Sequence, residues 1–209
     1  MEIIRGKHAS FIDEPALVER LAGYDAIHVD IGTGDGRFVA HLARACPNAF
    51  VIGIDACREN LRDVSRVAPE NALFIIANAQ GLPAALRSLA SQVTINFPWG
   101  SLLEGLLAND PALLAGLRRV ARPNTMLEVR LNGGALAEAG WSLEDGGSRV
   151  RDVLAENGFD VPPPIALRAG ELKAIPTTWA KRLAFGRDPR ALYLRAVRNV
   201  STVSELERV

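Results

Sequence analysis

A glycine-rich loop directly after an apolar run constrains this chain more than any other feature. Residues 26–30, AIHVD, have the composition of a buried strand, and the loop after them has glycine at alternate positions, Gly32, Gly34 and Gly36. Residues 37–45 then follow a helical pattern that stops before Pro47. Glycine accepts positive φ and lets a ligand approach the backbone closely. This order of strand, bare loop and helix predicts a parallel α/β sheet with a ligand at the carboxyl end of the first strand.

The rest of the chain continues the alternation of strand and helix. We expect further strands at residues 50–55, 72–78, 93–97, 125–131, 164–169 and 190–198, and helices at 58–67, 82–90, 101–108, 111–120 and 149–157. The Gly- and Ala-rich residues 132–148 are expected to form a loop, and residues 1–12 to begin with a short β-hairpin. The pattern predicts one α/β domain, residues 1–209, with a seven-stranded, mostly parallel sheet and helices on both faces.

Composition and charge narrow the class of protein. The 209 residues include 24 basic and 24 acidic side chains, so the net charge is zero, and 48% of the residues are hydrophobic. Such a chain is typically globular, and any basic surface on it must be local. Cys46 and Cys57 lack metal-ligand spacing, and no apolar run is long enough to span a membrane. We therefore expect free thiols, no metal site, no membrane partner and a cytoplasmic location.

Two classes of cofactor suit such a loop: dinucleotides and S-adenosylmethionine (SAM). The dinucleotide fingerprint, G-x-G-x-x-G, requires a third glycine where this chain has Arg37. The pattern D-x-G-x-G-x-G, which starts at Asp30, instead resembles class I SAM-dependent methyltransferases, in which an acid here typically meets the cationic methionine part of SAM. Asp55, at the end of the second strand, suits the ribose hydroxyls of either cofactor. The alternative is that both acids only cap their strands.

The loop after the third strand completes this resemblance. Asn78, Ala79 and Gln80 stand where the family often has an Asp-Ala-Glu-like stretch that holds the adenine of SAM, and amide groups can also bond an adenine edge. The resemblance implies a Rossmann-like fold with SAM as cofactor. The expected cofactor-binding residues are Asp30, Gly32, Thr33, Gly34, Gly36, Asp55, Ala56, Ala79, Gln80, Asn96 and Ser101.

Two tryptophan motifs narrow the resemblance further. NFPWGS, residues 96–101, and PTTWAKRLAFGRDPRALYL, residues 176–194, are similar to the aminoglycoside-resistance methyltransferases that act on N1 of adenine 1408 in bacterial 16S rRNA. That family places two tryptophans about a flipped adenine, which implies this role for Trp99 and Trp179, with Pro98 stiffening the first loop. Residues 132–148 and 171–190 would be insertions on the substrate side. The alternative is that both tryptophans belong to the core.

Basic residues cluster near these motifs. Residues 166–198 hold eight Arg or Lys and only two acids, which suits contact with RNA phosphates. A second stripe recurs at helical spacing after the second strand, although a solvated helix face is an equal alternative. The expected RNA-binding residues are Arg5, Lys7, Arg58, Arg62, Arg66, Lys181, Arg182 and Arg187. The partner implied is 16S rRNA in the small ribosomal subunit, and we expect a monomer.

The chemistry implied needs no general base. N1 of adenine has an in-plane lone pair and is largely unprotonated at neutral pH, so positioning and desolvation would suffice. Three alternatives stay open at this point. A tRNA guanine-N7 methyltransferase of the same fold typically has F-P-D-P-W where this chain has FPWG. A SAM-binding regulatory protein without turnover and a dehydrogenase are the other two.

Overall fold

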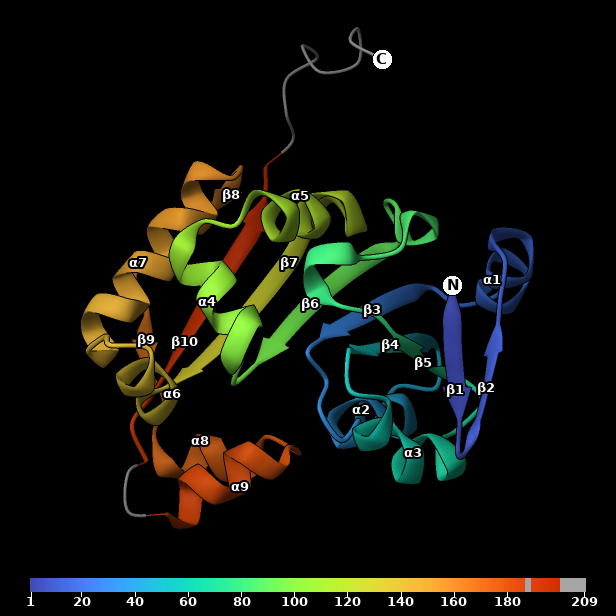
Figure 1. Ribbon diagram of the computed structural model, residues 1–209, viewed down its shortest axis with the longest axis horizontal. Helices are drawn as coiled ribbons and strands as arrows, with labels where there is room; N and C mark the ends of the chain where they lie inside the picture. Colours follow the sequence, from blue (N-terminus) through green and yellow to red (C-terminus); the bar gives the residue numbers. More distant parts are fainter. Residues whose placement is uncertain (187–188, 200–209) are drawn as a thin grey trace, which may run out of the picture.

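The computed structural model describes residues 1–186 and 189–199, which fold around one mixed β-sheet (Figure 1). Within those residues the sheet has ten strands, in the order β2-β1-β5-β4-β3-β6-β7-β10-β8, with β9 paired to β10. They comprise the seven strands expected, the two strands of the expected hairpin (β1 and β2), and one short strand, β8, that was not expected. The strands are β1 (Glu2–Arg5), β2 (His8–Phe11), β3 (Ala26–Ile31), β4 (Ala49–Asp55), β5 (Ala72–Ile76), β6 (Ala90–Asn96), β7 (Ala121–Asn132), β8 (Phe159–Asp160), β9 (Ile165–Ala166) and β10 (Ala191–Arg198).

The centre of the sheet is parallel, as expected. The pairs β3–β4, β4–β5, β3–β6 and β6–β7 are parallel, whereas β10 runs antiparallel to β7 and the β1–β2 hairpin adds antiparallel to β5. The chain moves outward from β3 to β5 in one direction and returns to continue through β6 and β7 in the other. The strand order therefore reverses between β3 and β6, and a ligand crevice is expected at the carboxyl ends of these strands.

Helices cover the two faces of the sheet unevenly. The helices are α1 (Glu14–Leu21), α2 (Arg37–Ala45), α3 (Arg58–Val67), α4 (Gly100–Ala108), α5 (Pro111–Val120), α6 (Gly133–Glu138), α7 (Leu143–Glu156), α8 (Ala169–Ala174) and α9 (Thr178–Phe185). One apolar cluster buries α1, α4, α5 and α7 against one face, and a smaller cluster buries α2 and α3 against the other face of β4 and β5. A third cluster packs α8 and α9 around Phe97 and Ala191 at the carboxyl edge. No helix in the described part of the chain is long and apolar enough to cross a membrane.

Two expected elements differ from the structure. The helix expected at residues 82–90 is only a 3₁₀ turn, Ala84–Leu86, because Ser88 adopts positive φ and β6 already begins at Ala90. The loop expected at residues 132–148 is instead α6 and the first part of α7. Asn132 caps α6 by accepting the Ala135 N–H at 2.7 Å, and Ser142 caps α7 by accepting the Asp145 N–H at 3.0 Å. Side-chain capping therefore overrides the glycine content.

The last third of the chain also departs from expectation. The strand expected at residues 164–169 is reduced to β9, Ile165–Ala166, and α8 begins at Ala169. The described part of the predicted segment 171–190 holds most of α8 and all of α9, which lie together beside the carboxyl edge of the sheet (Figure 1). Leu172 is the buried residue of α8, and the three-residue spacing of Ala180 and Leu183 places both on one face of α9. This small helical layer stands over the crevice between β3 and β6.

Candidate active site

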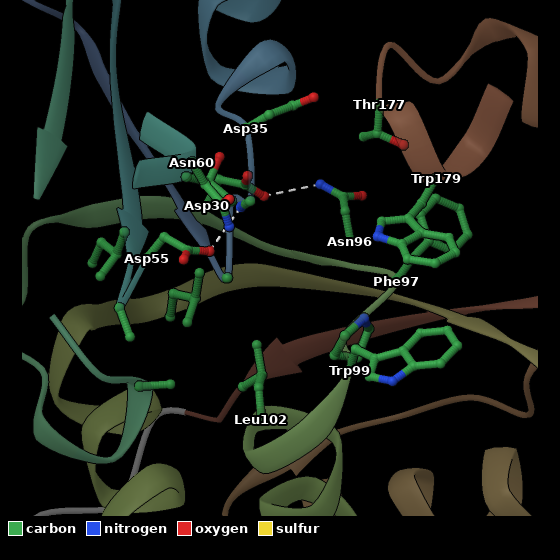
Figure 2. A pocket seen from close by; sticks show the side chains of 18 of the residues that line it. Asp30, Asp35, Asp55, Asn60, Asn96, Phe97, Trp99, Leu102, Thr177 and Trp179 are labelled. Atoms are coloured by element: carbon green, nitrogen blue, oxygen red, sulfur yellow. Dashed lines mark hydrogen bonds between the residues drawn. The ribbon is translucent and has the colours of Figure 1, made fainter. Parts of the chain in front are cut away.

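A pocket of about 370 Å³ opens at the carboxyl ends of β3, β4, β5 and β6, large enough for a cofactor-sized ligand (Figure 2). It brings together most of the residues predicted from the sequence. Those that line it are Asp30, Gly32, Thr33, Gly34, Asp55, Ala56, Ala79, Asn96, Pro98, Trp99, Ser101 and Trp179. Gly36 and Gln80 do not line it. Lining residues that the sequence analysis did not assign to the site include Asp35, Asn60, Phe97, Leu102, Thr177 and Thr178.

The three loop glycines have different roles. All adopt positive φ, at 71° for Gly32, 57° for Gly34 and 75° for Gly36. A Cβ atom at Gly32 would lie 2.5 Å from Leu102 Cδ2, and one at Gly36 would lie 2.5 Å from Phe74 Cε1. A Cβ atom at Gly34 would meet nothing within 4 Å. Gly32 and Gly36 therefore permit close packing of the loop, while Gly34 leaves open space on the pocket side.

Asp30 is a fully buried carboxylate with one uncompensated oxygen. Its Oδ1 accepts hydrogen bonds from Thr94 Oγ1 at 2.5 Å and Asn96 Nδ2 at 2.9 Å. Its Oδ2 makes no hydrogen bond of normal geometry with the described residues, although the nearby Thr33 hydroxyl helps to lower the pKa of Asp30. Burial raises the pKa of Asp30 from 3.8 to about 6, against the hydrogen bonds, which lower it. A buried, unpartnered carboxylate oxygen is costly. Its place at the pocket wall fits a ligand that brings a cation or a strong donor.

A polar network behind the pocket holds Asp30 in place. Register places Asp30 beside Thr94, and Asn96 beside Arg130, on the face of the sheet against which α2 and α3 pack. Arg130 Nη1 donates to Asn96 Oδ1 at 2.8 Å, and Arg130 Nη2 pairs with Glu128 at 2.8 Å. Because Asn96 Oδ1 is engaged by Arg130, its amide nitrogen is turned toward Asp30. Glu128 and Arg130 could not be predicted from the sequence, since the members of this hydrogen-bond network meet only through strand register.

The same network includes two groups that titrate far from their ordinary range. Tyr193 donates to Glu128 Oε1 at 2.8 Å, and burial is the main cause that raises the pKa of Tyr193 to about 12. His28 lies 3.1 Å from Thr94 Oγ1, and burial lowers the pKa of His28 to about 4. Both side chains are therefore neutral near pH 7. Glu128 and Arg130 compensate each other as an ion pair at 2.8 Å, and Asp30, with its pKa of about 6, is mostly ionised at this pH.

Asp55 connects two loops that border the pocket. Its Oδ2 accepts the Gly34 N–H and its Oδ1 accepts the Cys57 N–H, each at 2.8 Å. Burial raises the pKa of Asp55, while these two bonds lower it. Each oxygen retains a lone pair for a further donor. Asp55 thus both shapes the glycine loop and can accept hydroxyl groups of a ligand.

Gln80 braces the far side of the pocket rather than lining it. Its Nε2 donates to the Ser101 carbonyl at 3.0 Å, which links the 3₁₀ turn after β5 to the start of α4. Asn78 caps that turn by accepting the Gln80 N–H at 3.0 Å. Ala79 and Asn78 are left to form this wall of the pocket.

Trp99 and Trp179 stack on each other at the mouth of the pocket. Their ring centroids lie 5.0 Å apart with planes inclined by 17°, and the residues are 38% and 37% exposed. Figure 2 shows both indoles on the side of the pocket opposite Asp55. The Arg182 guanidinium covers Trp179 at 5.1 Å from its ring centroid. These tryptophans are therefore surface residues of the site and not core residues.

Two contacts set the position of the tryptophan loops. Thr178 donates to Asp35 Oδ2 at 2.5 Å, which ties the start of α9 to the glycine loop. Phe97 adopts positive φ, and its N–H donates to the Arg130 carbonyl at 2.7 Å. Pro98 is buried directly before Trp99. Each tryptophan is thus presented by a segment that is bonded to the pocket wall.

The predicted RNA-binding residues form two groups. Arg5 and Lys7 are exposed at the hairpin turn, and the Gly6 N–H donates to Ser65 Oγ at 2.9 Å, which seats this turn on α3. Arg66 of α3 is exposed, Arg58 and Arg62 are half-buried, and Arg62 pairs with Glu59 at 3.3 Å. Lys181 and Arg182 are exposed on α9. Arg187 lies outside the described residues.

The sequence and the fold both have relatives among known proteins. Residues 2–198 match a family described as NpmA, 16S rRNA (adenine(1408)-N(1))-methyltransferase. An Escherichia coli protein named 16S rRNA (adenine(1408)-N(1))-methyltransferase is 31% identical over 208 residues, covering 90% of this chain and 94% of the relative.

Solved structures of similar proteins superpose along nearly the whole chain. The 16S rRNA methyltransferase KamB superposes with a TM-score of 0.86 at 27% identity, covering 96% of this chain and 100% of that one. A variant of the 16S rRNA (adenine(1408)-N(1))-methyltransferase from Catenulisporales acidiphilia, solved with its cosubstrate SAM, superposes with a TM-score of 0.84 at 26% identity, covering 96% and 98%.

Proposed function

Because the chain belongs to the NpmA family of 16S rRNA (adenine(1408)-N(1))-methyltransferases, we propose that it methylates N1 of this adenine within the small ribosomal subunit. The observation that carries this assignment is a pair of half-exposed, stacked indoles beside a pocket with one uncompensated buried carboxylate oxygen. Such a pair supplies flat faces for a base, and the pocket supplies a place for SAM. We further propose that the enzyme acts in the cytoplasm as a monomer and confers aminoglycoside resistance.

The residues of the pocket fit SAM by charge and by shape. Asp30 Oδ2 would accept a hydrogen bond from the ammonium group of the methionine part of SAM, whose positive charge would compensate the buried oxygen. Asp55 would accept hydrogen bonds from the ribose hydroxyls of SAM. Gly34 leaves open space, so that the ligand can lie close to the backbone. When bound, SAM supplies an electrophilic methyl group on a sulfonium sulfur. The protein then has to hold that group in line with the acceptor nitrogen.

The tryptophans would hold the flipped adenine between them. A base that enters such a stack needs rings about 7 Å apart, twice the ~3.4 Å spacing of stacked bases. The ring centroids are now 5.0 Å apart, so the indoles must separate by at least about 2 Å. Each indole face that contacts the base contributes ~1–3 kcal/mol. Pro98 limits the freedom of the Trp99 loop and so reduces the entropy lost on binding.

Positioning and exclusion of water are the contributions that this site makes to the reaction. The N1 lone pair attacks the methyl carbon, and the electrons of the broken carbon–sulfur bond remain on sulfur, so no proton has to be removed. The carboxylates of the pocket, Asp30, Asp35 and Asp55, are engaged in hydrogen bonds that shape the pocket. Arg182, Lys181, Arg66 and the hairpin residues Arg5 and Lys7 would bind rRNA phosphates and orient the substrate.

The direct test is transfer of a radiolabelled methyl group from SAM to purified small ribosomal subunits, followed by primer extension to locate the modified nucleotide. We expect a stop at adenine 1408 with the unaltered protein. Trp99→Ala and Trp179→Ala should lose transfer while SAM binding, measured by calorimetry, stays within a few-fold of the starting value. Trp141→Phe is the matched control, because Trp141 packs against the main core away from the pocket. Full activity in both alanine variants would rule out the base-holding role.

The same assay separates the remaining alternatives. Transfer to tRNA and not to the small subunit would indicate a guanine-N7 enzyme. SAM binding without transfer to either RNA would indicate a regulatory protein. Family membership leaves no support for a dehydrogenase. Resistance is tested by expression in a susceptible bacterium, in which the inhibitory concentrations of kanamycin and apramycin should rise with the intact protein and not with Trp179→Ala.

A further inference from the structure

A second groove, separate from the SAM pocket, lies between α2 and α9. Its volume is about 230 Å³, and three of its lining residues are cationic: Arg37 and Arg44 from α2, and Lys181 from α9; His41 of α2 also lines it. Val64 and Val67 of α3 form an apolar floor. Figure 1 shows α9 and α2 facing each other at this end of the molecule. We name this hollow the α2–α9 groove.

The charge of this groove follows from its walls. Arg37, His41 and Arg44 recur at intervals of four and three residues, so they share one face of α2. The helices α2 and α9 contain no Asp or Glu. The acids of α3, Glu59 and Asp63, do not line the groove. The groove therefore presents a concentrated positive surface on a chain whose total charge is zero.

The arginines of the groove are held in different ways. Arg44 Nη2 donates to the Val67 carbonyl at 3.0 Å, so a neutral group orients its guanidinium and leaves its charge available. Arg37 Nε lies 3.3 Å from Asp35 Oδ2, so part of the charge of Arg37 is compensated. Lys181 is exposed on the opposite wall. Arg44 and Lys181 are therefore the cations best placed to meet an anion from both sides.

The position of α9 connects this groove to the proposed base site. Trp179 lines the SAM pocket and Lys181 lines the α2–α9 groove. Two residues along a helix correspond to about 200° of rotation, so these side chains leave α9 on opposite sides. The helix is roughly 10 Å across, which is the scale of a nucleotide and its flanking phosphate. An RNA strand with its base beside Trp179 would therefore cross α9 with its backbone near the groove.

We propose that the α2–α9 groove binds a backbone phosphate of the RNA next to the flipped nucleotide, with Arg44 and Lys181 as its principal ligands. This inference rests on the proposed function, and it adds α2 to the RNA-binding surface. A phosphate held there would fix the strand over α9 while the base turns toward the tryptophans. The site is sequence-independent, because it contacts the backbone alone.

The test measures how salt affects binding to small ribosomal subunits. Each phosphate contact that is lost reduces the slope of log K against log salt concentration by about 0.7–0.9. We expect this reduction for Arg44→Ala and for Lys181→Ala, and about twice the reduction for the double variant. Arg87→Ala is the matched control, since Arg87 is exposed just before β6, at the opposite end of that strand from the pocket. Calorimetric SAM affinity should be unchanged in all four proteins, which also reports that they are folded.

Several outcomes would overturn the proposal. Slopes for the single and double variants equal to those of the unaltered protein and Arg87→Ala would show that the groove binds no phosphate. A reduced slope with assembled subunits but not with naked 16S rRNA would assign the groove to a ribosomal protein instead. The proposed function is tested separately by methyl transfer with the unaltered protein. Transfer to adenine 1408 together with unchanged slopes would refute the groove alone.

Discussion

The substitution Asp30→Asn is expected to stabilise the protein while it weakens cofactor binding. Asp30 is 0% exposed, and its pKa rises from 3.8 to about 6 in the folded state. A carboxyl group with a raised folded pKa keeps its proton longer in the folded state than in the unfolded chain. Folding therefore loses stability as the pH rises through the window from 3.8 to about 6, and the cost is fully present above it.

The size of this effect follows from the pKa shift. About two pKa units at 1.36 kcal/mol each give a cost of up to about 3 kcal/mol near pH 7.5. Asparagine keeps an acceptor oxygen for Thr94 and Asn96 but carries no charge, so it removes this cost. The gain should shrink to roughly half at pH 5, where Asp30 is mostly protonated. Loss of the charged contact with the SAM ammonium, about 1.5–3 kcal/mol, should weaken SAM binding roughly 10- to 150-fold.

The assay is urea unfolding of the unaltered protein and Asp30→Asn at pH 7.5 and pH 5, with SAM titrations by calorimetry at both. Asp63→Asn on the exposed surface of α3 is the matched control, and its difference in unfolding free energy should not change with pH. A destabilised Asp30→Asn at pH 7.5, or a difference in unfolding free energy that does not vary with pH, would refute the reasoning. Unweakened SAM binding would separately refute the role of Asp30.

Three further predictions concern the support of the site. Arg130→Met should weaken SAM binding about tenfold and raise the pH midpoint of that binding, because a cation that lowers the pKa of the buried carboxyl is removed; an unchanged midpoint in pH-dependent calorimetry would contradict this. Gly36→Ala should cost roughly 1–3 kcal/mol in urea unfolding, since its Cβ would lie 2.5 Å from Phe74 at a φ of 75°. Thr178→Val removes the bond to Asp35 and should lower kcat/KM for the small subunit while SAM affinity is largely kept; equal losses in both would argue against a role in presenting the RNA-facing helix.

Local signals in the sequence were sufficient for only part of the first half of the fold, since α1 was not expected and the helix expected at residues 82–90 is a 3₁₀ turn. The bounds of α2 and α3 match the expected ranges, because their apolar spacing and the breaks after Ala45 and Val67 are local properties. Residues 132–148 were misjudged because Gly146 and Gly147 resemble loop glycines. They lie within α7, where a Cβ at Gly146 would be 2.5 Å from Leu136 Cδ2. Glycine there serves close helix packing, which only the tertiary structure reveals.

The sequence predicted those residues of the candidate site that follow strand ends, but not those that meet through strand register. Residues that follow a strand end, such as Asp30, Asp55 and Trp99, could be found because strand order alone brings them to one edge of the sheet. Arg130 could not be found in this way. Its relation to Asn96 depends on the register between β6 and β7, and no local pattern determines that register. The α2–α9 groove was missed for the same reason, because α2 and α9 are separated by more than a hundred residues.

Without substrate, Trp99 and Trp179 stack on each other, so this contact competes with the stacking of a base between them. In the proposed reaction the two indoles must lose their contact with each other before each of them gains a stacking contact with one face of the flipped base. A large purine that fills both surfaces recovers more than was given up, whereas a smaller pyrimidine recovers less. The energy needed to separate the two indoles therefore favours a larger base over a smaller one.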